Sequence, residues 1–315
     1  MSDGAHLLIP YAHGSSEGCA EVLRTLALPH LEKLAARLTP GVVDAGTPEA
    51  LSPPHERALA RAYGLAVTDG QIPWAAWQAR EAGHDAAQPW AWVTPCHWQL
   101  GRDHIRMLHP LALQLDAADS RALMAAMQPY FEQDGIALTY DAPTLWLAYG
   151  EVFRGLPTAS LDRVIGQAID PWLPRSPQAK ALCRLQSEMQ MLLYTHPVNE
   201  ARERGGLLPV NSFWLSGTGA LPADAGPPPA GLRVVHYLRD AALRADWSAW
   251  AEAWRLLDNG ECARLLRELD AGQPVTLTLC GERHSQTWHT GKAGFFARFM
   301  SQIARQPASR LLEPL

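Results

Sequence analysis

Lysine is scarce in this sequence, and long apolar runs are absent. Only Lys33, Lys180 and Lys292 occur among 315 residues, and Lys+Arg 27 against Asp+Glu 32 leaves a net charge of -5. This balance argues against a nucleic-acid partner, because nucleic-acid-binding domains carry a basic face. No run reaches the roughly 18 apolar residues of a membrane span, so we expect no membrane insertion.

The sequence also lacks paired cysteines, and we expect no export signal. The five cysteines are odd in number and widely spaced, without a C-x-x-C pattern, which excludes a secreted disulfide framework. The N-terminus lacks the basic and apolar regions of a signal peptide. With 47% hydrophobic and 19% charged residues the chain is typical of a globular protein, and we predict a cytoplasmic location.

Strand-like and helix-like segments alternate in the two ends of the chain. Residues 6–12 predict a buried strand, and residues 17–38 follow with helical spacing. Pro29 interrupts that spacing, which predicts two shorter helices. The other elements expected here are a helix over 56–63, strands over 210–217, 232–238 and 275–280, a helix from Trp247 closed by 258–260, and helices over 262–269 and 295–303.

The middle of the chain has a different pattern. Two pairs of strand-like segments, 90–113 and 136–150, flank a helix over 116–131 that Asp116 or Asp119 caps. The spacing of Leu182, Leu185 and Met189 predicts a long helix over 178–195.

These patterns predict a three-layer α/β fold, in which a sheet carries helices on both faces, with an inserted α+β (ββαββ) subdomain. We place the α/β core in 1–88 and 205–315, and the insertion, with the long helix, in 89–204. The prediction requires residues 7–11 and 232–237 to lie in one sheet.

Polar residues gather where the long helix ends and where the strand over 210–217 ends. Asn199 and Arg202 share a face if their turn is helical, and arginine offers a planar fork to phosphate or carboxylate. The turn over 216–219 runs into Leu221-Pro222 and not into a helix, which excludes a Walker-type nucleotide site. We predict that one cleft is lined by His196, Asn199, Arg202, Asn211, Ser216 and Thr218.

A structural interpretation of the same residues stays open. In that interpretation His196 ends a core stripe, Arg202 pairs with an acid, and the glycines only close a turn.

The segment 184–219 resembles the RpfE-type regulatory proteins, which are described as similar to archaeal-type cofactor-independent phosphoglycerate mutases. The matching residues are His196-Pro197-Val198-Asn199, Arg202, Pro209-Val210-Asn211 and Gly217-Thr218-Gly219. The resemblance implies that the cleft binds phosphate or a small phosphorylated metabolite. A protein partner stays open.

This sequence departs from the mutases at the residues that the resemblance implies for catalysis. The mutases use a phosphorylated serine and two metal ions, with an Asp at the end of the first strand. This chain has Pro10-Tyr11-Ala12-His13 there, and no Asp lies four residues before a His. Without two metals the transferring phosphoryl group loses its main stabilisation. We therefore predict a non-catalytic, regulatory binder without metal or cofactor, and keep an active phosphotransfer enzyme as the alternative.

A second candidate is the segment His13-Gly14-Ser15-Ser16, where a strand ends and a helix begins. We predict that His13 and Ser15 help to bind an anion there. This segment resembles the His-Gly-Ser start of sirohydrochlorin chelatases, in which the strand-end histidine binds metal. A chelatase-like enzyme that uses His13 is therefore a further alternative. An ordinary turn with a capping serine is the structural interpretation.

Four residues near the first predicted hairpin raise a separate question of metal binding. Cys96 and His97 are adjacent and point to opposite faces of a strand, and His104 and His109 add no tetrahedral spacing. We expect a hairpin that carries surface histidines, and whether a metal binds there stays open.

Overall fold

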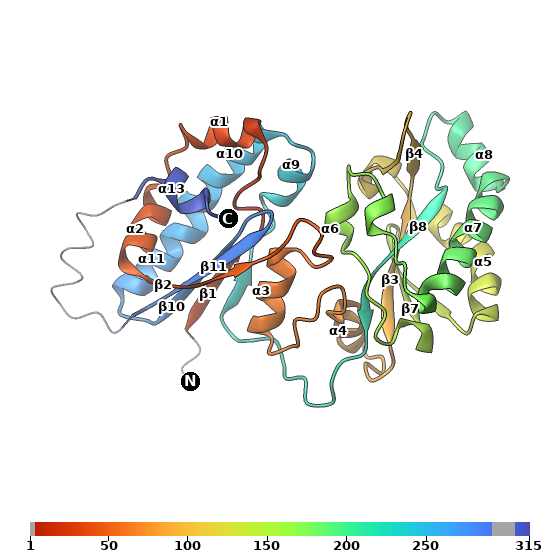
Figure 1. The fold of residues 1–315 in the computed structure, drawn as a ribbon, viewed down its shortest axis with the longest axis horizontal. Coiled ribbons are helices and arrows are strands. Elements are labelled where there is room, and N and C mark those ends of the chain that lie inside the picture. The colour runs from red at the N-terminus through yellow and green to blue at the C-terminus, as the bar shows by residue number, and fades with distance from the viewer. Residues whose placement is uncertain (1–3, 292–305) are drawn as a thin grey trace. The chain divides into compact units, whose positions relative to one another are not determined.

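The computed structural model describes residues 4–291 and 306–315, and the chain divides into two compact units (Figure 1). The first unit comprises 1–48, 53–65 and 226–315, and the second comprises 49–52 and 66–225. The helix expected over 295–303 lies outside the described residues.

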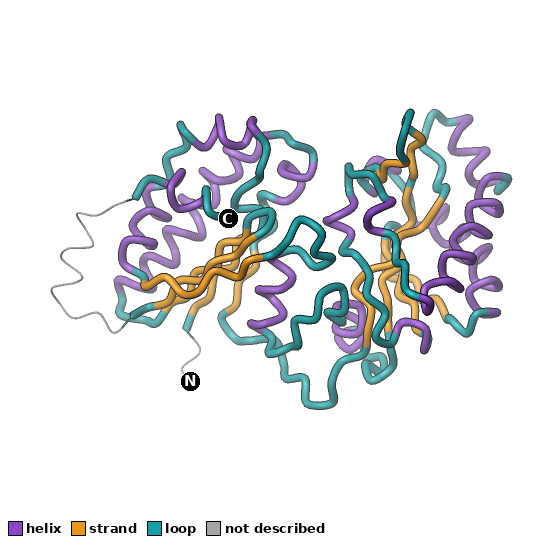
Figure 2. Tube along the Cα trace, viewed as in Figure 1, coloured by secondary structure: helices purple, strands orange, loops and turns teal. Residues whose placement is uncertain are grey.

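The first unit contains a five-stranded sheet in the order β2-β11-β10-β1-β9. Its strands are drawn in orange on the left of Figure 2. Strand β1 runs parallel to β9 and to β10, with Leu7 opposite both Arg233 and Leu277. This pairing confirms that the predicted strands near 7–11 and 232–237 share one sheet. The strands are β1 (Ala5–Ile9), β2 (Thr39–Ala45), β9 (Leu232–Val234), β10 (Val275–Cys280) and β11 (His284–His289).

Most helices of this unit cover one face of the sheet (Figure 1). The predicted break at Pro29 is confirmed, since α1 ends before it and α2 begins at it. The helices are α1 (Glu17–Leu23), α2 (Pro29–Arg37), α3 (Pro54–Ala62), α9 (Arg239–Leu243), α10 (Trp247–Leu257), α11 (Ala263–Asp270) and α13 (Ala308–Leu312).

Helix α10 ends at Leu257 with Asp258 as its C-cap, as predicted, but a π-helical segment follows where a turn was expected. The chain continues from α10 through a π-helical segment, Asp258–Cys262, into α11. The wider turn brings the buried carboxylate of Asp258 to the start of α2, where it accepts hydrogen bonds from the amides of His30 (3.2 Å) and Leu31 (2.7 Å). Asp258 therefore ends α10 and also caps the start of α2.

Strand alternation explains why the two faces of the sheet differ. Leu7, Leu277 and Leu279 point into the main core, whereas the residues between them point to the face that α3 covers. On that second face a small apolar cluster of Leu8, Ala58 and Cys280 packs under α3. Helices lie on both faces, as expected, but the second face is covered far less.

The second unit contains a four-stranded antiparallel sheet in the order β6-β7-β3-β8 and a separate two-stranded ribbon of β4 and β5. The predicted hairpin over 136–150 is present as β6 and β7. The ribbon pairs Trp98 with Met107, so the other predicted hairpin is present in a shorter form. The strands are β3 (Trp90–Cys96), β4 (Trp98–Leu100), β5 (Ile105–Met107), β6 (Ala137–Ala142), β7 (Leu145–Tyr149) and β8 (Ser212–Gly219).

Helices pack on both faces of this second sheet (Figure 1). Helices α5 and α7 bury Leu123, Phe131 and Leu185 against one face, and α4 packs against β3 and β8 on the other. Asp116 caps α5 through the amide of Asp119 at 2.8 Å. The helices are α4 (Trp74–Glu81), α5 (Ala117–Gln133), α6 (Leu161–Val164), α7 (Lys180–Tyr194) and α8 (Pro197–Arg204).

The division into units corrects the predicted boundaries. The prediction placed residues up to 88 and from 205 in the core, but α4 and β8 belong to the second unit. Six positions of β8 pair with β3, so this strand completes the second sheet. Its sequence reads as an ordinary strand, and nothing local in it shows which of the two sheets it joins.

Short helices complete the two units, and the longest described helix, α5, has 17 residues. None of the helices in the described part of the chain combines the length and the apolar character that crossing a membrane requires.

Candidate functional site

The predicted polar set begins where α7 ends and α8 starts. His196 is the N-cap of α8, and its Nδ1 accepts a hydrogen bond from the amide of Val198 (3.3 Å). Asn199 is buried in α8, and its amide nitrogen donates to the carbonyls of Leu193 (2.8 Å) and Val210 (2.7 Å). Its Oδ1 also accepts from the amide of Val210 at 2.9 Å. Asn199 therefore joins α7, α8 and the segment before β8.

Arg202 lies one turn further along α8 and is 3% exposed. Its Nη1 donates to Asp119 Oδ2 at 3.0 Å, and its Nε donates to the carbonyl of Leu208 at 3.1 Å. Its Nη2 donates to the carbonyl of Leu113. The guanidinium therefore connects α8 to α5, to the loop before α5 and to the segment that precedes β8. This agrees with the structural interpretation, in which Arg202 pairs with an acid.

The strand-side members of the set also have partners within the fold. Asn211 Oδ1 accepts a hydrogen bond from the amide of Trp98 at 2.7 Å, and Asn211 Nδ2 donates to the carbonyl of Trp98 at 2.9 Å. The Thr218 hydroxyl donates to the carbonyl of Leu156 at 2.6 Å and contacts the Thr158 hydroxyl at 3.0 Å.

The six residues do not converge on one cleft. Asn211 and Thr218 stand at opposite ends of β8, and a strand rises about 3.3 Å per residue, so they lie roughly 20 Å apart. Ser216, buried near the far end, lies well away from Arg202, whose strand-side partner is Leu208. The expectation of a shared cleft is corrected for this reason.

The predicted turn over 216–219 is the bulged end of β8. Gly217 has φ +64°, and a Cβ there would lie 2.8 Å from the Trp92 ring. A glycine is required by backbone conformation and by packing, so its presence does not mark a phosphate loop.

The histidines near the first hairpin do not form a metal site with Cys96. Burial raises the pKa of the Cys96 thiol far above its ordinary value, which keeps it protonated. His97 Nδ1 contacts the carbonyl of Pro209 at 2.8 Å, and His109 Nδ1 accepts from the amide of Leu111. Among residues 4–291 and 306–315, no three His, Cys, Asp or Glu side chains are grouped to hold a metal ion.

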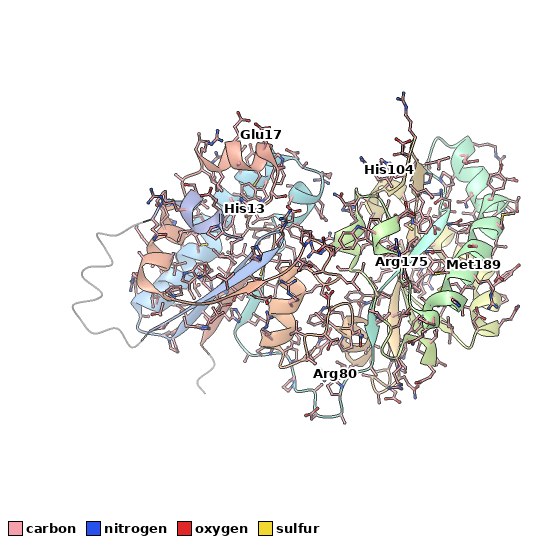
Figure 3. All side chains as sticks on the ribbon, viewed as in Figure 1. His13, Glu17, Arg80, His104, Arg175 and Met189 are labelled. Carbon is pink, nitrogen blue, oxygen red and sulfur yellow. The ribbon has the colours of Figure 1, made fainter. Side chains whose placement is uncertain are left out.

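His13, which is labelled in Figure 3, and Ser15 lie in the segment that joins the carboxyl end of β1 to α1 in the first unit. In parallel sheets, ligands bind beyond the carboxyl ends of strands, at a point where neighbouring connections diverge. Both neighbours of β1, β9 and β10, run parallel to it, so the carboxyl ends of the three strands share one edge of the sheet. Ser16 caps α1 by accepting from the amide of Cys19 at 3.3 Å. Ser15 itself is exposed.

The loop after β1 already holds an oxyanion. The amide of Ser15 donates to the Glu282 carboxylate at 2.8 Å, and Glu282 belongs to the turn between β10 and β11. His13 is half-buried, and burial lowers its pKa, while Glu282 and Glu313 act in the opposite direction. At neutral pH the imidazole is therefore uncharged and able to take up a proton when an anion arrives.

Sequence reasoning missed two further residues at this end of the sheet. Tyr11 has φ +58°, which is rare for a residue other than glycine, and its ring stacks on His55 with centroids 5.2 Å apart. The Tyr11 carbonyl accepts from Trp250 Nε1 at 2.9 Å, which holds the strained backbone in place. The one local signal was the break in strand pattern at Pro10.

Comparison with known proteins adds a partial match. No family model matches the chain. A stretch of 60 residues is 38% identical to a 2,3-bisphosphoglycerate-independent phosphoglycerate mutase of Methanothrix thermoacetophila. The match covers 19% of this chain and spans only 15% of that mutase's length.

Two solved structures are similar over their lengths. One is a cofactor-independent phosphoglycerate mutase from Thermoplasma acidophilum, with TM-score 0.39 and 13% identity over 99% of this chain and 98% of that one. The other is the PH0037 protein from Pyrococcus horikoshii, with TM-score 0.43 and 12% identity over 100% and 97%.

Proposed function

We propose that this chain is a phosphoglycerate-mutase-like protein of the RpfE type that binds a small phosphorylated metabolite and acts in regulation, without transferring the phosphoryl group. The binding site that we propose is the carboxyl end of β1, with His13 and the amide of Ser15 as the anion contacts.

One observation carries the location. The Ser15 amide donates to the carboxylate of Glu282 at 2.8 Å, so this loop presents a backbone donor to an oxyanion from a distant part of the chain. A phosphate oxygen has the same acceptor chemistry as a carboxylate oxygen and could replace it. His13 stands two residues before Ser15 and would gain a proton beside the phosphate.

The 60-residue match to a phosphoglycerate mutase supports the choice of a phosphorylated ligand. The non-catalytic part of the proposal rests on the sequence at the end of β1. There Pro10-Tyr11-Ala12-His13 stands where the mutases carry a metal-binding Asp. Two metal ions are the main source of charge stabilisation in their chemistry.

Calorimetry with 3-phosphoglycerate and with inorganic phosphate tests the binding. We expect saturable binding that strengthens as the pH falls from 7.5 to 6, because binding an anion favours the protonated form of His13. His13→Ala should weaken binding about tenfold, in line with the loss of one charge-assisted contact. His104→Ala is the matched control, since His104 is an exposed histidine in the second unit.

A mutase assay on protein purified without chelator tests the rest of the proposal. Absence of turnover with added Mn²⁺ or Zn²⁺, together with binding, agrees with it. Turnover with stoichiometric metal would show an active phosphotransfer or chelatase-like enzyme instead. If neither anion binds to the wild-type protein, the proposed function is wrong.

A further inference from the structure

A groove of about 770 Å³ lies on the sparsely covered face of the first unit's sheet. Its floor is formed by β1, β10, β11 and β2, and one wall is formed by α3. Pockets for small molecules commonly have 300–1,000 Å³, so its size suits such a ligand. The groove is separate from the anion contacts proposed at the end of β1, since neither His13 nor Ser15 lines it.

The floor of the groove is polar because of strand alternation. In β10 the residues Val275, Leu277 and Leu279 face the core, so Thr276 and Thr278 face the groove. The register brings polar residues of neighbouring strands beside them. His6 pairs with Thr276, which pairs with His289, and Thr278 pairs with Thr287.

Two groups of side-chain contacts connect these floor residues. His6 Nε2 contacts the Thr278 hydroxyl at 2.8 Å, and that hydroxyl contacts the Thr287 hydroxyl at 2.9 Å. His289 Nδ1 lies 3.4 Å from the Thr276 hydroxyl. Burial, with His289 as a lesser cause, lowers the pKa of His6 to about 4, so His6 is neutral at pH 7. The floor therefore offers uncharged groups that both donate and accept, which match the hydroxyls of a ligand.

A cationic group stands at one wall of the groove. Arg61 projects from α3 with 47% of its side chain exposed, and its Nη2 donates to Asp44 Oδ1 at 2.7 Å. Asp44 also accepts from Arg57 Nε at 2.9 Å, and the Arg57 side chain is 8% exposed. Arg61 donates to Asp44 through Nη2, and its other N–H groups can donate to a ligand anion. If Arg61 turns toward the ligand, Arg57 still pairs with Asp44.

The geometry points to a second binding site in this groove, for a small ligand that carries one anionic group and several hydroxyls. The anionic group contacts Arg61, and the hydroxyls contact Thr276 and Thr287, which lie beside the buried Thr278. Either a carboxylate or a phosphate ester supplies the anion. This site does not depend on the function proposed above.

Calorimetry on the full chain with D-gluconate and with sn-glycerol 3-phosphate tests the site. Sorbitol and inorganic phosphate are the comparison probes, because each carries only one of the two features. We expect the hydroxylated anions to bind at least tenfold more tightly than either comparison probe. Tighter binding of gluconate identifies a carboxylate, and tighter binding of glycerol phosphate identifies a phosphate ester.

Two variants locate the binding. Arg61→Gln should weaken it at least tenfold and Thr287→Val several-fold, whereas Thr25→Val, at the end of α1, should leave it unchanged. His13→Ala should also leave it unchanged, which separates this site from the one at the end of β1. Equal binding by wild type, Arg61→Gln and Thr287→Val would overturn the inference, as would the absence of binding by both hydroxylated anions.

A measurement on the wild-type protein covers the case in which a variant does not fold. His289 is exposed, so diethyl pyrocarbonate should modify it, and peptide mass spectrometry resolves it from the other histidines. The hydroxylated anion that binds should slow modification of His289 several-fold and leave His104 unaffected. Unchanged modification of His289 under saturating ligand would also overturn the inference.

Discussion

Arg202 gives the sharpest test of how the second unit is held together. The sequence suggested that Arg202 binds an anion. In the structure the same guanidinium is 3% exposed and has a carboxylate and two carbonyl groups as acceptors. We therefore predict that Arg202→Ala destabilises the second unit strongly.

The magnitude follows from the three contacts. Each hydrogen bond from a charged donor to a buried carbonyl contributes about 1.5–3 kcal/mol. The ion pair with Asp119 adds about 1 kcal/mol or less, because 32% of the Asp119 side chain is exposed to water. Water entering the space of the lost guanidinium offsets part of this sum. We expect a loss of about 3–5 kcal/mol, as for a broken buried pair.

Hydrogen exchange read by peptide mass spectrometry is the suitable assay, since a chain of two units need not unfold in one step. Amides in 109–117 and 197–211 should exchange faster in Arg202→Ala, while those of β1 and β10 should not change. Arg202→Lys should be intermediate, because an ammonium group cannot span three acceptors.

Arg204→Ala is the control for this prediction. Arg204 is exposed, and its Nε donates within α8 to the carbonyl of Glu200 at 3.2 Å, so its loss should cost under about 0.5 kcal/mol. If Arg202→Ala and Arg204→Ala exchange alike, the structural role assigned to Arg202 is refuted.

Three further predictions concern other parts of the chain. Glu282→Gln should tighten phosphate binding several-fold in calorimetry, because a neutral side chain competes less well for the Ser15 amide; weaker binding would contradict the proposed site. The free energy of unfolding of the first unit should fall as the pH drops from about 6.5 to 4, because the unfolded chain binds a proton at His6 that the folded unit excludes. In urea unfolding measured against pH, His6→Gln should flatten this part of the profile. Gly217→Ala should destabilise the second unit by about 1–3 kcal/mol in the same unfolding assay, since a Cβ meets the Trp92 ring at a positive φ; a neutral result would show that the bulge relaxes.

The sequence was sufficient for features that depend on neighbouring residues. Pro29 divides two helices because it lacks an amide hydrogen, and Asp116 caps α5 because its side chain reaches an amide three residues on. The strand β10 follows from strict alternation of valine and leucine with threonine.

Features that depend on distant residues could not be predicted in this way. Arg202 pairs with Asp119, which is 83 positions away in the sequence, and the amide of Ser15 donates to Glu282, which is 267 positions away. No local pattern encodes such pairs. The strand β2 was missed for another reason: it contains Pro40 and Gly41, which disfavour a strand, and it is accepted because it lies at the edge of its sheet.

The discontinuity of the first unit has a consequence for synthesis on the ribosome. Strand β1 is synthesised before the other strands of its sheet, and its partners β9 and β10 begin only at residues 232 and 275. The second unit consists almost entirely of 66–225, so it can fold while the chain is still being translated. The apolar residues of β1 therefore stay without their β10 partner until about 270 further residues have been added. At 5–20 residues per second this interval lasts roughly 15–50 s. During that time Leu7, Leu8 and Ile9, which are buried in the finished fold, lack the partners that cover them, and we expect chaperones to bind them.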